Sequence, residues 1–306
     1  MTQRRVLVTG ASGFVGRYII PALLRRGYEV HGIGRTRPDS MPPDTQFHIA
    51  DLLDAPTSAE VVKRVEATDL LHLAWYVTPG LFWRAPENLD WVAASLSLYR
   101  VFASAGGRRL VGVGTCAEYD WSQALLDEAG TPCHPATLYG VAKHALHQVL
   151  AAAAAQDGLS LAWGRLFFLY GPHEAPSRLV PDVALSLLRG DPALCGDGNV
   201  QRDFMHVEDA AGALAAVLDS DHTGPVNIAS GECRPMGDVI ASVAAELGRP
   251  DLVRFGARPT QTGEPAQLAA ATSVLHDRVG FRPAWGMSDG IAQTVGWWRS
   301  KLQSLP

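Results

Sequence analysis

The sequence predicts an α/β protein whose core is a doubly wound parallel sheet. Short apolar runs alternate with longer segments of helical periodicity through the first half of the chain, starting with the strand-like Arg5–Thr9 and the helix-like 14–26. The runs are apolar throughout, which is typical of strands buried on both faces of a parallel sheet. Strands that alternate with helices indicate βαβ units. A glycine-rich turn between the first strand and the first helix fits the same fold.

The elements divide the chain into two predicted lobes. The predicted strands are 5–9, 29–33, 47–50, 70–73, 110–113 and 160–166, and the helices between them are 14–26, 58–66, 86–105 and 138–156. After residue 171 proline and glycine become frequent, and helical pieces at 181–189, 207–218 and 236–247 are separated by irregular segments. We expect residues 1–171, with about 205–230 returning to the sheet, to form the first lobe. Residues 172–204 and 231–306 form a smaller mixed α/β C-terminal lobe.

Composition excludes several classes of protein. The 306 residues carry a formal net charge of -5, so the basic surplus that a nucleic-acid partner requires is missing. The longest apolar runs are too short for a membrane span or a signal peptide. The four cysteines are scattered, as in reduced cytoplasmic proteins, and form no metal-binding pair. We therefore expect a cytoplasmic protein with no nucleic-acid or membrane partner.

The turn after the first strand predicts a dinucleotide site of the Rossmann type. The sequence TGASGFVG places glycines at G-x-x-G-x-x-G spacing between the strand and the helix. Glycine permits the tight turn and the close approach of a pyrophosphate to the backbone, while the helix N-terminus supplies free N–H groups. An ordinary βα turn is the alternative. The predicted cofactor-binding residues of this turn are Gly10, Ser12, Gly13, Phe14, Val15 and Gly16.

The end of the second strand bears on the choice of cofactor. An NAD site would place an acidic residue there to bind the ribose 2′-hydroxyl, whereas this chain has Arg35 and Arg37. Arginine suits a 2′-phosphate, so NADP(H) is favoured and NAD(H) stays possible. Alternatively, Arg35 stacks on the adenine and Arg37 is solvated. Asp51 and Leu52, after the third strand, could border the adenine, or Asp51 could cap the next helix.

Tyr139 and Lys143 form a YxxxK pair on the predicted helix 138–156. Residues four apart on a helix lie on the same face, and an ammonium group beside a phenol favours the phenolate. Such a tyrosine can exchange a proton with a carbinol or carbonyl oxygen near neutral pH. Thr115 follows the strand 110–113 and places a hydroxyl at the carboxyl edge of the sheet, where open α/β sheets bind ligands.

Taken in order, these motifs resemble the extended short-chain dehydrogenase/reductase family over essentially the whole chain. The matching segments are TGASGFVG, His72-Leu73-Ala74, Thr115, Tyr139 with Lys143, RLFFLYGP, RDFMHV and NIASGE. The resemblance implies that Tyr139 is the general acid/base, that Lys143 lowers its pKa and holds the nicotinamide ribose, and that Thr115 bonds the reacting oxygen.

The resemblance also implies a nucleotide-sugar substrate. Leu73 and Ala74 would border the cofactor, and Arg202 would grip the pyrophosphate of the substrate, unless it forms a structural salt bridge to Asp203 or Asp209. The aromatic residues Trp75 and Tyr76, directly after His72-Leu73-Ala74, would form part of a lid over the substrate, or simply pack under a loop.

Two departures from the family pattern narrow the predicted reaction. Dehydratases of the family carry an Asp-Glu pair directly after the threonine, where this chain has Cys116 and Ala117. Phe168 replaces the asparagine of R-x-x-N-x-Y-G-P, so Cys116 and Phe168 are placed in a rearranged substrate pocket. Reduction of a 4-keto-6-deoxy sugar nucleotide at C4 is the favoured reaction. A 4-epimerase with tightly bound NAD is the alternative, and a non-catalytic dinucleotide sensor or scaffold is a remote one.

Two further expectations concern metals and assembly. His144 and His147 have a spacing that metal ligands could use, but the sequence offers no third ligand and the mechanism needs no metal, so none is expected. By resemblance, helices 86–105 and 138–156 would pair across a two-fold axis as a four-helix bundle, giving a homodimer. The small residues at 93–95 and 151–155 would permit close approach, although they could equally face the chain's own core.

Overall fold

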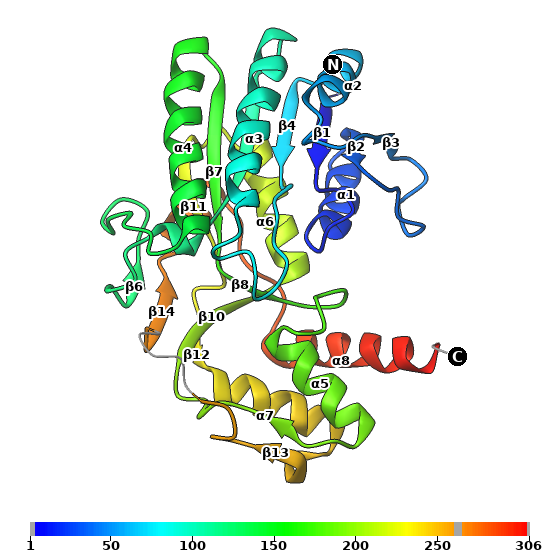
Figure 1. Ribbon diagram of the computed structural model, residues 1–306, viewed down its shortest axis with the longest axis vertical. Helices are drawn as coiled ribbons and strands as arrows, with labels where there is room; N and C mark the ends of the chain where they lie inside the picture. The colour runs from blue at the N-terminus through cyan, green and yellow to red at the C-terminus, as the bar shows by residue number, and fades with distance from the viewer. Residues whose placement is uncertain (1–3, 260–264, 305–306) are drawn as a thin grey trace.

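The computed structural model, which describes residues 4–259 and 265–304, confirms the doubly wound α/β fold. Seven strands form one parallel sheet in the order β11-β7-β5-β4-β1-β2-β3 (Figure 1). Their bounds are β1 (Arg5–Thr9), β2 (Glu29–Gly34), β3 (Gln46–Ile49), β4 (Asp69–His72), β5 (Arg109–Thr115), β7 (Ser160–Leu166) and β11 (Gly224–Ile228). The chain turns in opposite directions on either side of β1, so the carboxyl ends of β1 and β4 flank the crevice where such sheets bind ligands.

Helices cover both faces of this sheet. On one face α1 (Gly16–Arg25) packs against α6 (Val207–Asp219); on the other lie α2 (Ala55–Val65), α3 (Glu87–Ser104) and α4 (Leu138–Asp157). The alternation of side chains along β1 connects the strand to both layers, because Val6 and Val8 join the α1/α6 cluster while Leu7 joins the α2/α3/α4 cluster. Burial on both faces explains why the strands are apolar without alternation.

The described part of the smaller lobe contains a mixed sheet and three α-helices. Its strands run in the order β12-β10-β14-β6, with β8 also paired to β10; β10 and β12 are antiparallel, and the other described pairs of this sheet are parallel. A short β9/β13 pair lies nearby. The bounds are β6 (Leu125–Leu126), β8 (Phe168–Tyr170), β9 (Ala193–Leu194), β10 (Gln201–His206), β12 (Cys233–Pro235), β13 (Val253–Arg254), β14 (Gln267–Ala270), α5 (Leu179–Arg189), α7 (Met236–Leu247) and α8 (Met287–Gln303).

The predicted division into lobes stays a prediction, although two strands bear on it. β11 lies at one edge of the large sheet, beside β7, whereas β6 pairs with β14 across the predicted boundary. The predicted lobes include residues 1–3, 260–264 and 305–306, which lie outside the described residues.

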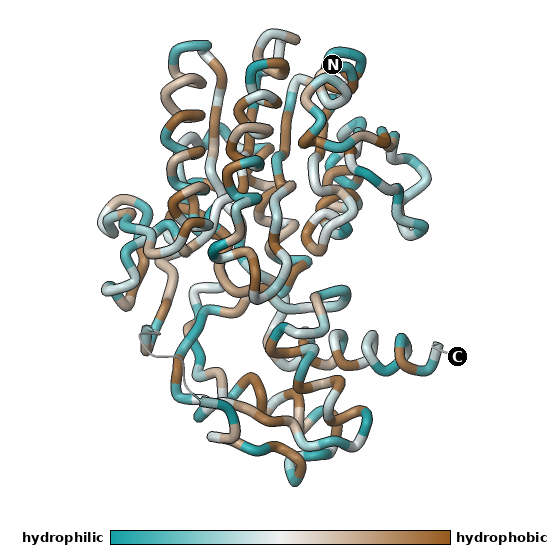
Figure 2. Tube along the Cα trace, in the orientation of Figure 1, coloured by the Kyte–Doolittle hydropathy of each residue, from teal (hydrophilic) through white to brown (hydrophobic). Residues whose placement is uncertain are grey.

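The C-terminal helix α8 is an element that sequence reasoning missed. Apolar and polar residues alternate along it (Figure 2), and its Ile291 and Val295 enter the apolar cluster of the smaller lobe. Two glycines lower its intrinsic helix propensity. Gly290 is required by packing, because a Cβ there would lie 2.3 Å from the Tyr170 hydroxyl. Among the described residues no helix combines the length and apolar character needed to cross a membrane.

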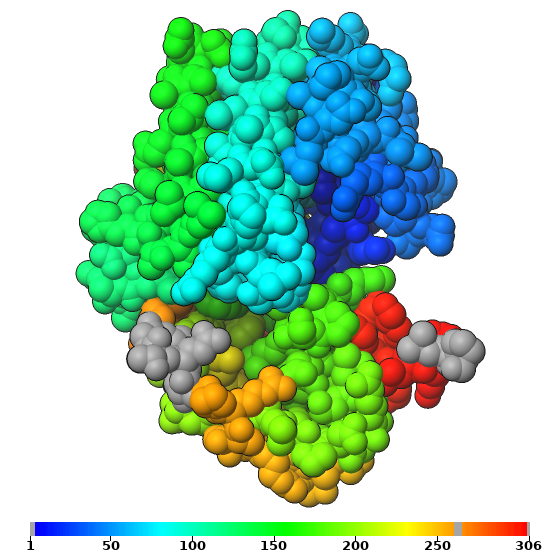
Figure 3. Space-filling view, in the orientation of Figure 1, coloured from blue at the N-terminus to red at the C-terminus, as the bar shows by residue number. Residues whose placement is uncertain are grey.

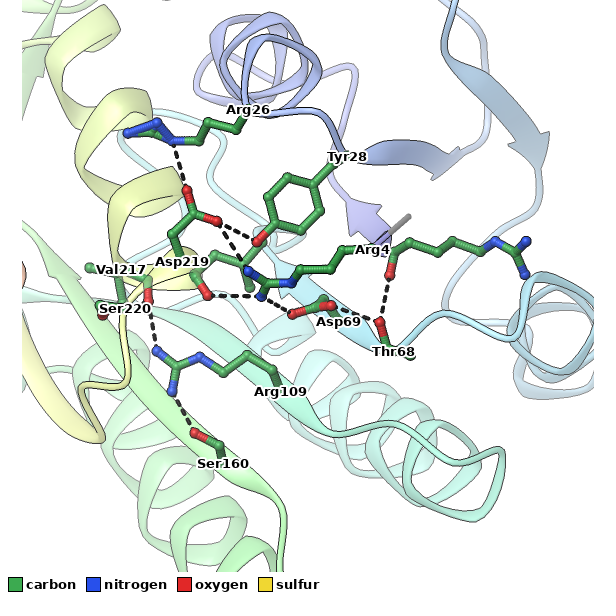
Figure 4. A network of polar contacts seen from close by, with 12 residues as sticks. Arg4, Arg26, Tyr28, Thr68, Asp69, Arg109, Ser160, Val217, Asp219 and Ser220 are labelled. Atoms are coloured by element: carbon green, nitrogen blue, oxygen red, sulfur yellow. Dashed lines mark hydrogen bonds and ion pairs between the residues drawn. The ribbon is translucent and has the colours of Figure 1, made fainter. Parts of the chain in front are cut away.

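A polar network ties the amino ends of the strands to the helices (Figure 4). Arg4 contacts Asp69 at 2.6 Å and Asp219 at 3.2 Å, and the Tyr28 hydroxyl donates to Asp219 at 2.6 Å. The buried Arg109 donates to the Val217 carbonyl at 2.6 Å. The end of α6 is therefore fixed to the edge of the sheet opposite the catalytic motifs.

Two glycines of β5 decide how closely the layer of α4 approaches the sheet. A Cβ on Gly112 would lie 2.3 Å from the Trp163 ring, and one on Gly114 would lie 2.1 Å from both the Trp163 indole nitrogen and the Glu118 carboxylate. On α4, a Cβ on Gly140 would lie 2.3 Å from the Ala117 carbonyl. These positions leave room for the buried Trp163 and Glu118 between the sheet and the helix that carries Tyr139 and Lys143.

We expect Gly114→Ala to lower the free energy of unfolding by roughly 1–3 kcal/mol, because the added methyl group overpacks a site filled by two fixed side chains. Chemical denaturation of the purified variant measures the change. Gly296→Ala is the matched control. A methyl group added there would meet no atom within 4 Å outside its own helix backbone, so the variant should be unchanged or more stable by roughly 0.5–1 kcal/mol. Equal effects of the two substitutions would contradict the packing argument.

Candidate active site

The predicted phosphate-binding turn has the backbone that a pyrophosphate requires. Gly10 has a φ of 68°, and its carbonyl accepts a hydrogen bond from the Gly13 N–H at 2.9 Å. A Cβ on Gly16 would lie 2.2 Å from the Gly10 carbonyl oxygen, so the start of α1 packs directly on the turn. Because these positions are glycines, no side chain fills the turn. The turn therefore fits a dinucleotide whose pyrophosphate lies at the helix N-terminus. Ser12, Phe14 and Val15 complete the turn and are partly exposed.

A buried polar chain joins this turn to β4. The Thr9 hydroxyl contacts His72 Nδ1 at 2.7 Å, and the other ring nitrogen of His72 contacts the Ser95 hydroxyl at 2.8 Å. The N–H groups of Leu73 and Ala74 donate to the Thr9 hydroxyl at 3.1 and 3.2 Å. Ala74 also lies against Gly10, where a Cβ would be 2.9 Å from the Ala74 nitrogen. The glycine turn and the segment Leu73-Ala74 therefore lie together at the crevice, where both are predicted to border the cofactor.

The residues predicted to select the cofactor lie along the ends of β2 and β3. Arg35 and Arg37 are exposed after β2, and Arg37 donates to the Thr45 carbonyl at 3.3 Å. Leu52 is buried, while Asp51 accepts a hydrogen bond from the Leu53 N–H at 3.0 Å. The helix cap proposed for Asp51 belongs instead to Asp54, the residue immediately before α2.

Tyr139 is enclosed by aromatic rings from the loop before α3. Phe82 and Trp83 meet its ring edge-on at centroid distances of 4.8 and 5.8 Å, and the Tyr139 N–H donates to the Trp83 carbonyl at 3.2 Å. Burial raises the pKa of the Tyr139 phenol, and hydrogen bonding by Thr115 opposes the rise. The aromatic density of this loop is plain in the sequence, but the contact of Phe82 and Trp83 with Tyr139 was not predicted.

Lys143 is buried one helical turn beyond Tyr139. Its ammonium donates to the Val113 carbonyl of β5 at 2.7 Å and lies 3.9 Å from the centroid of the Trp75 ring. Burial lowers the pKa of Lys143 to about 7, and the negative charge of Glu118 opposes the fall. Lys143 is not among the largest influences on the pKa of Tyr139, so the lowering predicted from YxxxK spacing is not a leading effect in this structure.

The aromatic pair after β4 divides between two environments. Trp75 is buried, and its indole N–H donates to the Asn88 side chain at 2.8 Å. Tyr76 is half-buried. Trp75 thus packs against the Lys143 ammonium, directly after Leu73 and Ala74. This placement agrees with the alternative in which Trp75 packs under a loop instead of forming part of a lid.

Thr115 is held by a short 3₁₀ turn, Cys116–Glu118, that begins where β5 ends. The Thr115 hydroxyl accepts a hydrogen bond from the Ala117 N–H at 3.2 Å, and the Glu118 carboxylate accepts one from the Thr115 N–H at 2.8 Å. This reciprocal arrangement is a capping box. Glu118 is a residue of the candidate site that sequence reasoning missed; its signal was the T-x-x-E spacing of the turn.

Three of the residues predicted to face the substrate, Cys116, Phe168 and Arg202, lie near one another. Cys116 and Phe168 belong to one apolar cluster, and the Arg202 guanidinium lies 5.5 Å from the Phe168 ring. Arg202 is buried and donates to the Gln201 and Pro265 carbonyls at 2.8 and 2.9 Å. Its positive charge reaches Cys116 and opposes the burial that raises the pKa of that thiol to about 12. Cys116 is therefore a protonated, inert thiol at neutral pH.

The two acids named as alternative partners of Arg202 bind other groups. Asp203 accepts hydrogen bonds from the Ser230 hydroxyl and the Gly231 N–H at 2.6 and 2.9 Å. Asp209 accepts from the N–H groups of Ala284 and Trp285 at 3.0 and 2.9 Å. Both carboxylates hold turns of the smaller lobe.

A third potential metal ligand lies beside His144 and His147. Glu118 offers an oxygen within 4.8 Å of a ring nitrogen on each histidine, which the sequence alone did not reveal. However, the carboxylate already accepts hydrogen bonds from Thr115, Trp163 and Arg165. A cation there would compete with the Arg165 guanidinium, 3.1 Å from the same carboxylate. The absence of a metal site stays a prediction.

Two charged residues before α5, Arg178 and Glu174, lie on the side of Tyr139 that faces the smaller lobe. Arg178, directly before α5, lowers the pKa of Tyr139 against the larger effect of burial, and it pairs with the buried Glu174 at 3.6 Å. Beyond it a hollow of about 260 Å³ opens between α5 and the segment after β9. Its walls include Leu179, Asp182, Val183, Leu194, Cys195 and Arg258.

Known proteins share both the sequence pattern and the fold. The sequence model of the NAD dependent epimerase/dehydratase family matches residues 6–229. A dTDP-6-deoxy-L-talose 4-dehydrogenase (NAD(+)) of Aggregatibacter actinomycetemcomitans is 26% identical over 249 residues, which cover 79% of this chain and 90% of that protein. A UDP-glucose 4-epimerase of Streptomyces lividans is 27% identical over 307 residues, covering 92% of each chain.

Among solved structures, the UDP-glucose 4-epimerase of Thermus thermophilus in complex with NAD is similar with a TM-score of 0.84 and 26% identity, covering 96% of this chain and 99% of that one. These similarities extend over both lobes. They confirm the resemblance to the extended short-chain dehydrogenase/reductase enzymes, and the chain belongs to the NAD dependent epimerase/dehydratase family.

Proposed function

We propose that this protein is an NAD(P)-dependent oxidoreductase that reduces a 4-keto-6-deoxy sugar nucleotide at C4. The observation that carries the proposal is the convergence of Thr115, Tyr139 and Lys143 at the carboxyl edge of the sheet, beside a glycine turn that fits a dinucleotide. When bound, the nicotinamide supplies or accepts the hydride.

The three side chains have separate tasks in this reaction. The Tyr139 phenol, kept protonated by its raised pKa, donates a proton to the carbonyl oxygen as the alcohol forms. The Thr115 side chain, whose hydroxyl is fixed by the capping box, holds the same oxygen. Lys143 would hold the nicotinamide ribose. The rings of Phe82 and Trp83 exclude water around Tyr139 and strengthen each polar interaction there.

The substitutions beside Thr115 favour hydride transfer without elimination. Cys116 and Ala117 occupy the positions of the acidic pair expected in a dehydratase. A buried thiol with a pKa raised to about 12 cannot act as the base at neutral pH, and an alanine carries no titratable group. Loss of water from C5 and C6 of the sugar therefore has no acid/base pair here.

The 4-epimerase is supported as strongly by the relatives, which include several UDP-glucose 4-epimerases. An epimerase would use the same Tyr139 to remove and return the proton on one oxygen. The sequence favours the reductase through Arg35 and Arg37, which suit the 2′-phosphate of NADP(H). The similar solved structures that name a cofactor name NAD, so NAD(H) is the second candidate.

We expect the sugar nucleotide to bind at the junction of the predicted lobes. Its sugar would lie near Tyr139 and Cys116, with Arg202 and Arg178 on the side of the smaller lobe. The hollow beside α5 would accept the nucleoside. Both lobes must then contribute to binding, which agrees with the similarity to nucleotide-sugar enzymes along the whole chain. We further propose that the enzyme is cytoplasmic.

Replacement of Tyr139 by Phe should lower turnover by about 10²–10⁴-fold while dinucleotide binding remains, because only the transferred proton is lost. The assay mixes the protein with NADPH or NADH and 4-keto-6-deoxy sugars linked to dTDP, CDP, GDP or UDP. Stoichiometric oxidation of the cofactor by the wild type indicates the reductase. Tyr99→Phe is the control, since that hydroxyl bonds Asp157 away from the site.

A second assay, with UDP-glucose or UDP-galactose in place of the keto sugars, separates the alternatives. Interconversion of these two without net consumption of cofactor would establish the epimerase instead. A wild-type protein that binds no dinucleotide would refute both. Binding without any turnover on the panel, together with an unaltered biological role of the Tyr139→Phe variant, would favour the sensor.

Replacing Arg35 and Arg37 by alanine should weaken NADPH binding by about 10–100-fold, because two charge-assisted contacts to the 2′-phosphate are lost. Binding of NADH should change little. Tryptophan fluorescence titration measures both affinities, and Arg25→Ala, at an exposed arginine of α1, is the control. A wild type that binds NADH as tightly as NADPH would reject the proposed preference.

We propose a homodimer formed through α3 and α4, which lie side by side on one face (Figure 3). Leu89 on α3 and Val141 and Val149 on α4 are 61%, 46% and 50% exposed. Val149→Glu should therefore shift the wild-type dimer to monomer in sedimentation velocity, whereas Phe255→Glu, in the smaller lobe, should not. A monomeric wild type would refute the proposal.

A further inference from the structure

The most completely buried charge near the catalytic residues is the carboxylate of Glu118. It is 0% exposed and lies between β5 and α4. The Trp163 indole N–H donates to both of its oxygens, at 2.9 and 3.1 Å, and Arg165 Nε donates to one of them at 3.1 Å. Such a charge is stable only because it is fully hydrogen-bonded and paired.

Stability alone is a weak reason for this arrangement. A buried ion pair can often be replaced by apolar side chains of similar volume without loss of stability. Here the carboxylate also requires Gly114 in the interior strand β5, where glycine is unfavourable, and the Trp163 ring that bonds the carboxylate requires Gly112. A role in the active site would explain why the Glu118 carboxylate lies at a position where β5 must have glycine to make room for it.

One such role is direct and geometric. The carboxylate accepts the Thr115 N–H at 2.8 Å, while the Thr115 hydroxyl accepts the Ala117 N–H at 3.2 Å. Both the backbone and the side chain of Thr115 are therefore fixed by the turn that Glu118 closes. The Gly140 contact with the Ala117 carbonyl ties the same turn to the helix of Tyr139.

A second role concerns charge. The Lys143 ammonium bonds the Val113 carbonyl, and the Glu118 carboxylate lies against Gly114, the next residue of β5. The field of Glu118 favours the charged form of Lys143, against the loss of solvation that favours the neutral amine. Other titratable groups surround the two residues. Near Glu118 lie Arg165 on β7, His144 and His147 on α4, and Cys133 in the loop before α4. Near Lys143 lies His72 on β4. His72 and His147, with pKa values lowered by burial to about 3 and about 4, are neutral at pH 7.

We propose that Glu118 is a positioning residue of the active site, whose buried carboxylate fixes Thr115 through the capping box and serves as the counter-charge of the Lys143 ammonium. The inference deepens the proposed function, on which it rests for the roles of Thr115 and Lys143. Its direct test needs no substrate, so failure of the test and failure of the proposed function are distinguishable.

The lysine content of the chain makes the charge of Lys143 measurable. The three lysines are Lys63, Lys143 and Lys301, and both Lys63 and Lys301 are exposed. Protein labelled with ¹³C at lysine Cε should give three resolved NMR signals, and Lys143→Arg identifies the one from the buried residue. Titration of the whole protein from pH 5 to 11 then yields each lysine pKa.

Glu118→Gln keeps the size and one acceptor oxygen of the side chain but removes its charge. Because the carboxylate raises the Lys143 pKa, its removal should lower that pKa by about one pH unit. Lys143 then becomes neutral at lower pH, and the alkaline limb of the kcat profile should move to lower pH with it. Glu128→Gln, a half-buried acid that bonds the Asn227 N–H, is the matched control and should leave Lys143 unchanged.

Glu118→Asp separates the two roles and guards against a glutamine variant that fails to fold. It retains the charge but is too short to keep the hydrogen bond to Thr115. We expect a Lys143 pKa close to that of the wild type and a kcat lowered by at least tenfold. A Lys143 pKa unchanged by Glu118→Gln, or lowered equally by Glu128→Gln or Glu118→Asp, would overturn the counter-charge; an unchanged kcat in Glu118→Asp would overturn the positioning of Thr115.

Discussion

The close approach of α4 to the central strand β5 is the constraint on which the site depends. Parallel sheets covered by helices usually keep their layers apart by the side chains of both surfaces. Here Gly112 and Gly114 leave a space on β5 that is filled by Trp163 and the Glu118 carboxylate, and Gly140 lets α4 lie against the Ala117 carbonyl of the turn after β5. The Lys143 ammonium can then reach a strand carbonyl, that of Val113, at 2.7 Å.

Burial has opposite electrostatic consequences for the two residues of the YxxxK pair. It raises the pKa of the Tyr139 phenol and lowers that of the Lys143 ammonium to about 7, since in each case the neutral form is favoured. The site therefore holds a protonated phenol ready to donate and an ammonium close to losing its charge. Any group that supports the Lys143 charge acts directly on the pH range of the enzyme, and Glu118 and Trp75 are such groups.

Sequence reasoning located residues correctly where a pattern depends on local spacing, and the roles of those residues in binding and catalysis stay predictions. Gly10, Gly13 and Gly16 follow a strand and open a helix, and Tyr139 and Lys143 are one helical turn apart; both patterns are complete within a few residues. Thr115 could be placed beside them because the carboxyl ends of parallel strands share one edge. The main strands and helices of the larger sheet were located within a few residues for the same reason.

The remaining features depend on contacts between distant segments. Phe82 reaches Tyr139 through a loop whose path no periodicity describes, and Glu118 meets Trp163 only after two strands pair. The helix α8 contains glycines that lower its propensity, one of them dictated by the distant Tyr170. The two-residue strands β6, β9 and β13 are too short to show any alternation.

The position of the acid after Thr115 bears on the proposal that this chain does not catalyse elimination. A dehydratase of this family would present its acid/base pair directly after the threonine, where Cys116 and Ala117 stand. In this chain the carboxylate comes one residue later, on the last residue of the 3₁₀ turn, and it points beneath the strand toward Trp163 and Arg165. In the proposed reductase, a group that could have removed a proton from the sugar would thereby be held away from it. The same displacement places Glu118 at the end of the capping box of Thr115, an arrangement that we expect to favour hydride transfer over elimination.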